Sequence, residues 1–108
     1  MLNVPSIDPI TLKAELDGPN PPIVIDVREP EELEYSFLPD AVEIPLHDLP
    51  LRLGELDPSS NFVVICRVGG RSAQATDYLL QHGFQQVRNL TGGMNAWARQ
   101  VDPSMAEY

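Results

Sequence analysis

The sequence predicts an α/β fold in which a mainly parallel sheet carries helices on both faces. Short runs of β-branched and other apolar residues alternate along the chain with segments of helical periodicity. The apolar runs at 23–27 and 62–66 are nearly continuous, which is typical of strands that are buried on both faces. The length of 108 residues fits one domain spanning 1–108, and residues 103–108 are expected to form a tail.

Four strands and five helical segments follow from the local patterns. Proline, glycine and asparagine clusters separate strands at 23–27, 41–44, 62–66 and 87–90. Asp8 and Pro9 are suited to start a helix, because aspartate is a good N-cap and proline is tolerated in the first turn. The other helical segments are expected at 30–35, 47–55, 72–82 and 94–98, after a first helix at 9–16.

Composition and charge exclude several classes of function. The net charge of −9 argues against nucleic-acid binding, because phosphates require a basic surface. No apolar run can cross a bilayer and the N-terminus does not resemble a secretory signal, so we expect no membrane association and a cytoplasmic location. One cysteine and two widely separated histidines cannot form a usual zinc site, so neither a metal nor another cofactor is expected.

Positive charge is concentrated in the second half of the chain. Residues 1–60 hold 13 acidic against three basic side chains, a net charge of −10. Residues 61–108 hold three acidic against four basic side chains, a net charge of +1. The acidic half could serve solubility alone. Alternatively, the positive charge is concentrated at one site, because Arg67 and Arg71 lie close in sequence to the only cysteine, Cys66.

The turn between the 62–66 strand and the next helix is the candidate site. It consists of Cys66, Arg67, Val68, Gly69, Gly70, Arg71 and Ser72. A helix start favours an anion, a glycine pair lets backbone N–H groups converge, and the two arginines add positive charge. We therefore expect the thiol to ionise at neutral pH and to act as a nucleophile. The alternatives are a structural buried cysteine, an ordinary glycine turn, and surface arginines.

These residues, with others in chain order, resemble the rhodanese-like sulfurtransferase family. The matching segments are 25–28, 39–45, 66–73, 83–84 and 90–97. The resemblance implies a five-stranded parallel sheet flanked by helices on both faces. The end of the chain, from Trp97 to Ser104 and at Tyr108, is similar to rhodanese domains fused to the adenylating enzymes of molybdopterin and thiamine biosynthesis. One difference is Ser36-Phe37-Leu38, where many relatives have Gly-His-Ile.

The resemblance also implies a thiosulfate sulfurtransferase type of activity. Thiosulfate, or the persulfide of a cysteine desulfurase, would load sulfur onto Cys66, and residues 67–72 would bind the substrate and the persulfide. The outer sulfur would pass to cyanide in assays or to a sulfur-carrier protein. Asp26 and Arg28 would support the site. Asp26 is expected to accept backbone N–H groups, and Arg28 either pairs with a carboxylate or helps to hold thiosulfate.

Two other functions are compatible with the same fold. One is a non-catalytic binding or regulatory module. The other is a small cysteine phosphatase or arsenate reductase. Those enzymes have a wider Cys-x5-Arg loop for a tetrahedral oxyanion, whereas Cys66 and Arg71 are separated by four residues and position 72 is serine. Neither His47 nor His82 is expected to take part in catalysis.

Overall fold

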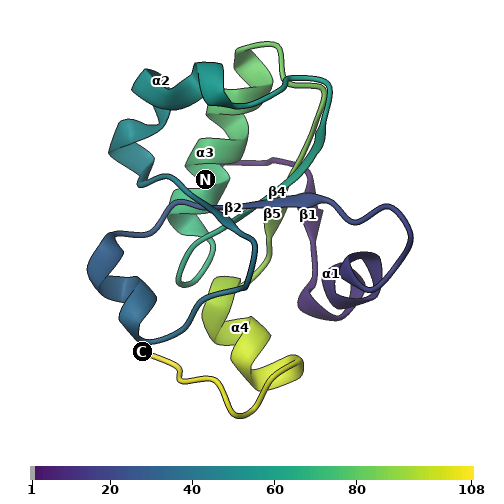
Figure 1. The fold of residues 1–108 in the computed structure, drawn as a ribbon, viewed down its shortest axis with the longest axis vertical. Helices are drawn as coiled ribbons and strands as arrows, with labels where there is room; N and C mark the ends of the chain where they lie inside the picture. The colour runs from purple at the N-terminus through teal and green to yellow at the C-terminus, as the bar shows by residue number, and fades with distance from the viewer. Residues whose placement is uncertain (1) are drawn as a thin grey trace.

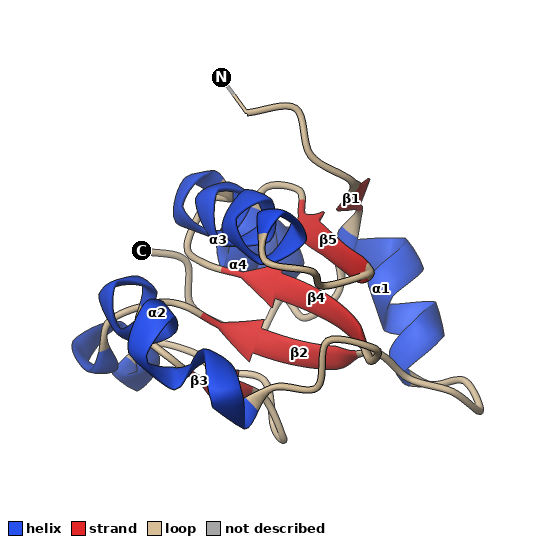
Figure 2. Ribbon diagram, turned by 90° about the horizontal axis from the view of Figure 1, so that it is seen from above, coloured by secondary structure: helices blue, strands red, loops and turns tan. Residues whose placement is uncertain are grey.

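The computed structural model describes residues 2–108 and contains one sheet of five strands. The strands are β1 (Ser6–Ile7), β2 (Ile23–Asp26), β3 (Val42–Glu43), β4 (Asn61–Ile65) and β5 (Gln86–Leu90). They lie in the order β1-β5-β4-β2-β3, and every neighbouring pair is parallel. Figure 2 shows β2, β4 and β5 side by side. The predicted α/β class and five-stranded parallel sheet are confirmed.

Helices cover both faces of the sheet. The α-helices are α1 (Pro9–Leu16), α2 (Leu49–Arg52), α3 (Gly70–Gln81) and α4 (Gly93–Gln100). Three 3₁₀ turns are η1 (Pro30–Glu34), η2 (Leu46–Asp48) and η3 (Leu53–Glu55). In Figure 1 the sheet is nearly edge-on, with α2 and α3 on one side and α1 and α4 on the other. No helix within residues 2–108 is both long and apolar enough to cross a membrane.

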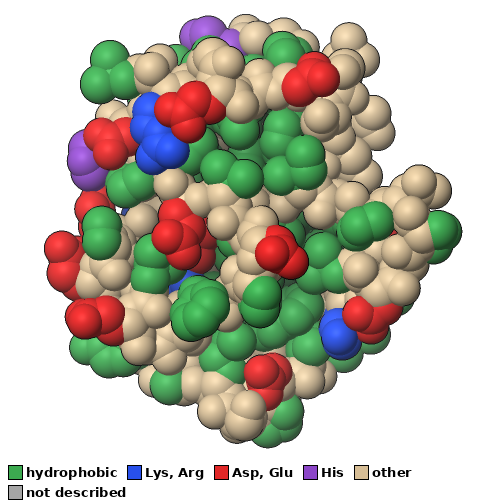
Figure 3. Space-filling model, viewed as in Figure 1, with side chains coloured by type: hydrophobic (Ala, Val, Ile, Leu, Met, Phe, Trp, Pro, Cys, Tyr) green, Lys and Arg blue, Asp and Glu red, His purple; other side chains and the backbone are tan. Residues whose placement is uncertain are grey.

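Two apolar clusters hold these layers together, and β4 contributes to both. Phe62 and Val64 pack with the cluster under α2 and α3, whereas Val63 and Ile65 pack with the cluster under α1 and α4. All four side chains are buried, which explains the continuous apolar run in the sequence. On the outside of the molecule, acidic side chains are spread over the face that Figure 3 shows, and basic side chains there are few.

The structure departs from the sequence-based expectations at three places. Strand β1 was not expected, and it pairs with β5 over only two residues. The helix expected at 47–55 is divided into η2, α2 and η3, with Pro50 lacking the N–H that a continuous helix needs. Helix α3 begins at Gly70 rather than at Ser72, because Gly69 adopts a left-handed conformation (φ +104°) and serves as the N-cap.

Candidate functional site

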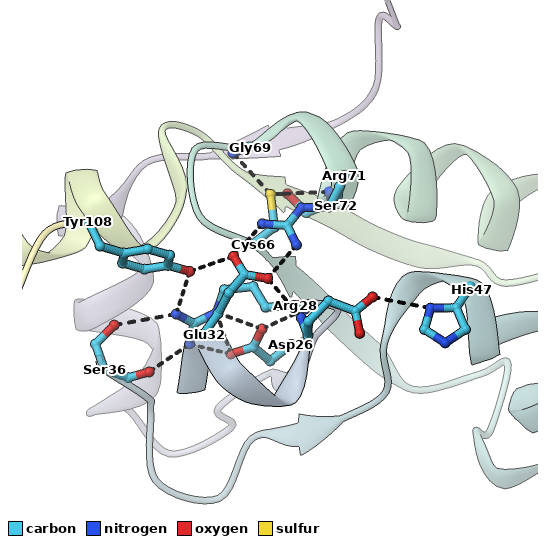
Figure 4. A network of polar contacts seen from close by, with 11 residues as sticks. Asp26, Arg28, Glu32, Ser36, His47, Cys66, Gly69, Arg71, Ser72 and Tyr108 are labelled. Carbon is cyan, nitrogen blue, oxygen red and sulfur yellow. Dashed lines mark hydrogen bonds and ion pairs between the residues drawn. The ribbon is translucent and has the colours of Figure 1, made fainter. Parts of the chain in front are cut away.

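The sulfur of Cys66 lies inside a turn of the backbone. Cys66 directly follows β4, and the residue is only 1% exposed. Its Sγ accepts hydrogen bonds from the backbone N–H groups of Gly69 (3.1 Å) and Ser72 (3.3 Å), as Figure 4 shows. The hydroxyl of Ser72 lies 3.2 Å from the same sulfur. Two amide donors are therefore directed at the atom that the sequence analysis singled out.

Close backbone packing against the start of α4 supports the turn from the other side. In the first turn of α4, the N–H groups of Met94 and Asn95 donate to the carbonyl oxygens of Cys66 (2.8 Å) and Arg67 (3.1 Å), respectively. Gly93 has a φ of +60°, and a Cβ there would lie 2.5 Å from those two carbonyl groups. Only glycine allows this contact, because backbone atoms cannot move aside as a flexible side chain can.

Asn89 on β5 completes the surroundings of the sulfur. Its Nδ2 donates to the carbonyl oxygen of Gly69 (3.2 Å), and its Oδ1 accepts from the hydroxyl of Ser72. Both Ser72 and Asn89 are buried. The sequence analysis did not identify Asn89. Because the same strand also holds Gln86 and Arg88, a polar side chain at position 89 does not stand out in the sequence and says nothing about its partner.

Arg71 is paired with a carboxylate of the protein itself. Its Nη1 and Nη2 donate to the two oxygens of Glu32 on η1, at 2.6 and 2.7 Å. Glu32 is not among the site residues that the sequence predicts, and its carboxylate is the partner of Arg71 in place of the bound anion expected at the start of the helix. The hydrogen bonds from Arg71, with smaller contributions from the Glu29 N–H and the Tyr108 hydroxyl, lower the pKa of Glu32 to about 2. The same ion pair raises the pKa of Arg71.

The low pKa of Glu32 predicts a loss of stability in acid. A carboxyl whose pKa is about 2 when folded, against an ordinary 4.5, stabilises the fold above pH 4.5 and loses that contribution as pH falls towards 2. Glu32→Gln should remove about 1–2 kcal/mol of this pH dependence, because the 34% exposure of the Arg71 side chain allows some screening. Urea unfolding at several pH values measures it. Glu34→Gln is the control, since Glu34 is exposed. Equal pH slopes for the wild type and Glu32→Gln would contradict the prediction.

Asp26 and Arg28 form a buried ion pair beside the Cys66 turn. Arg28 Nη2 lies 2.7 Å from Asp26 Oδ2, and both side chains are at most 1% exposed. Asp26 Oδ1 also accepts from the backbone N–H of Arg28, as expected for this carboxylate. The guanidinium further donates to the carbonyl oxygen of Ser36 (2.8 Å) and, more weakly, to its hydroxyl (3.4 Å). Arg28 was expected either to pair with a carboxylate or to help hold thiosulfate, and in the structure it pairs with the carboxylate of Asp26.

The final residue, Tyr108, links these two ion pairs. Its hydroxyl accepts from Arg28 Nη1 (3.1 Å) and donates to Glu32 (2.8 Å), as seen in Figure 4. The guanidinium of Arg67 lies over its ring, 5.0 Å from the centroid. The segment expected to be a tail has no helix or strand, yet its last side chain packs against the site. Nothing in the sequence pattern pointed to this contact.

The hydrogen bonds to Cys66 Sγ come from Gly69 and Ser72, and the remaining candidate residues have other surroundings. Val68 is 60% exposed, and with Gly69 and Asn89 it lines an open surface pocket beside the turn. His47 is exposed and its Nδ1 lies 3.2 Å from a Glu29 oxygen. His82 is also at the surface. Within residues 2–108, no three histidine, cysteine or acidic side chains are grouped as metal ligands would be.

Comparisons with known proteins agree with this architecture. The model of the rhodanese-like domain matches residues 8–100. A sulfurtransferase of Allochromatium vinosum is 39% identical over 103 residues, which cover 95% of this chain and 96% of that protein. The adenylyltransferase and sulfurtransferase MOCS3 of Arabidopsis thaliana is 31% identical over 102 residues, covering 80% of this chain and 22% of that protein.

A solved structure extends the comparison to the fold. The crystal structure of a rhodanese-like domain protein from Staphylococcus aureus matches with a TM-score of 0.83 and 31% identity, covering 96% of this chain and 98% of that chain. The resemblance to rhodanese domains, including those joined to adenylating enzymes, is thereby confirmed. Matched over most of its length, the chain belongs to the rhodanese-like domain family.

Proposed function

We propose that the chain is a sulfurtransferase that carries sulfur as a persulfide on Cys66. The observation that carries the proposal is the turn whose backbone N–H groups, from Gly69 and Ser72, point at Sγ. Such a cradle stabilises negative charge on sulfur without using side chains. The sulfurtransferase of Allochromatium vinosum, similar over nearly the whole chain, supports the same activity.

The reaction divides into two sulfur transfers. In the first, the Cys66 thiolate attacks the outer sulfur of thiosulfate; a new S–S bond forms, the donor's S–S bond breaks, and sulfite leaves with the electron pair. In the second, a nucleophile such as cyanide attacks the outer sulfur of the persulfide. A C–S bond forms, the S–S bond breaks, and the Cys66 thiolate is restored with release of thiocyanate. No redox cofactor is needed for either step.

Charge near the turn suits anionic donors. Arg67 is exposed at the rim, and its positive charge attracts thiosulfate or an anionic persulfide. The persulfide of a cysteine desulfurase is the protein donor of the same chemistry. The similarity to MOCS3, named as an adenylyltransferase and sulfurtransferase, supports a sulfur-carrier protein as the acceptor. We place this transfer in the cytoplasm, without nucleic acid or membrane.

The test is direct loading of the protein with sulfur. The purified chain is incubated with thiosulfate, or with a desulfurase carrying a persulfide, and its intact mass is measured. We expect a gain of one sulfur atom on Cys66, lost again when cyanide is added, with an equal amount of thiocyanate formed. Absence of any mass gain with both donors would refute the proposal.

A further inference from the structure

The side chain of Asn89 determines which atoms donate and which accept in the hydrogen bonds beside Cys66, because it bonds to both Gly69 and Ser72. The carbonyl oxygen of Gly69 can only accept a hydrogen bond, so the atom of Asn89 facing it is the amide nitrogen, at 3.2 Å. The other atom of this amide, Oδ1, therefore faces Ser72. Because Oδ1 can only accept, the hydroxyl proton of Ser72 points to Asn89 and not to the sulfur.

Ser72 consequently presents a lone pair, not a proton, to Cys66. The hydroxyl oxygen is 3.2 Å from Sγ, so the sulfur completes this contact by donating its own proton. We infer that Asn89 is a positioning residue: by fixing the hydroxyl of Ser72, it makes Ser72 the acceptor of the Cys66 thiol proton. This arrangement opposes the two backbone N–H groups, which favour the thiolate. The inference rests on the proposed function and adds which group receives the thiol proton of its nucleophile.

The charged groups near the sulfur lie outside β5, and the Asn89 side chain makes no bond to any of them. Arg71 is bound by Glu32, and Arg28 is bound by Asp26. Tyr108 and Arg67 are two further titratable or charged groups at the site, where Tyr108 contacts both Arg67 and these ion pairs. The side chain of Asn89 bonds only to Ser72 and Gly69 among the described residues. Substituting Asn89 thus changes the direction of the Ser72 hydroxyl and removes the bond to Gly69, but it leaves these ion pairs in place.

The rate of Cys66 alkylation by iodoacetamide, measured against pH, tests the inference. Asn89→Leu frees the Ser72 hydroxyl to donate to the thiolate, so the midpoint of the profile should fall by about one pH unit. Asn89→Asp keeps an acceptor for Ser72 and adds negative charge, so the midpoint should rise. Asn61→Leu is the control, because Asn61 starts β4, at the opposite end of that strand from Cys66, and its side chain contacts Arg88.

The variant Ser72→Ala tests whether Ser72 accepts the thiol proton, even if Asn89→Leu does not fold. If Ser72 accepts the thiol proton, removing its hydroxyl lowers the midpoint; if Ser72 donates to the thiolate, the midpoint rises and the inference is overturned. A midpoint that stays unchanged in both Ser72→Ala and Asn89→Leu overturns it as well. Alkylation requires no sulfur donor, so this experiment can fail while sulfur loading succeeds, or the reverse.

Discussion

Replacing Cys66 with serine is expected to abolish sulfur transfer, with a loss of at least about a thousandfold in thiocyanate formation. A hydroxyl cannot form a persulfide, and no other thiol exists in the 108 residues to replace it. Serine is close in size and can still accept the N–H groups of Gly69 and Ser72, so the fold should persist. Intact mass after thiosulfate treatment and the rate of thiocyanate formation measure the effect.

Circular dichroism and thermal unfolding of Cys66→Ser provide the structural control. Both should match the wild type, because the turn is supported by α4 through backbone contacts that serine does not alter. A variant that remains folded and still forms thiocyanate at more than about a tenth of the wild-type rate would show that another group carries the sulfur.

Substituting Arg28 with methionine should produce the largest loss of stability, about 3–5 kcal/mol. Methionine fills much of the same space but leaves the Asp26 carboxylate, at 1% exposure, without its partner. An unpaired charge in the interior is strongly unfavourable, whereas a paired one is tolerated. Urea unfolding gives the free energy. Adding Asp26→Asn to the variant should recover part of the loss, since the neutral amide is less costly to bury.

Arg88→Met is the matched control for this substitution. Arg88 makes an equally short bidentate contact with Glu15, at 2.8 and 2.7 Å. Its side chain and that of Glu15 are 26% and 33% exposed, so solvent screens the pair and the loss should be at most about 1 kcal/mol. Similar losses for Arg28→Met and Arg88→Met would mean that burial does not control the strength of these ion pairs.

The central strands could be predicted because their own residues determine them. The segments 24–25 and 62–65 are apolar and mostly β-branched, and their side chains are buried under the helices on the two faces of the sheet. Strand β1 could not be predicted in this way. Its two residues, Ser6 and Ile7, are in a strand only because β5 pairs with them, and a two-residue segment has no periodicity.

The candidate site likewise has a part that is local in the sequence and a part that depends on distant residues. The Cys66 turn is local, and its glycines and helix start are visible in consecutive residues. Its partners come from elsewhere: Glu32 is 39 positions from Arg71, and Tyr108 is 80 positions from Arg28. An acidic residue in a solvated segment gives no indication of which arginine it will meet, so these contacts required the folded chain.

The supports of the Cys66 turn follow it in the chain, and this has a consequence for biosynthesis. A ribosome releases Cys66 and the turn before it releases Asn89, the start of α4 and Tyr108. The thiol therefore leaves the ribosome before the residues that enclose it do. Because these contacts are non-local, the enclosed form of the turn can assemble only after α4 has also left the ribosome.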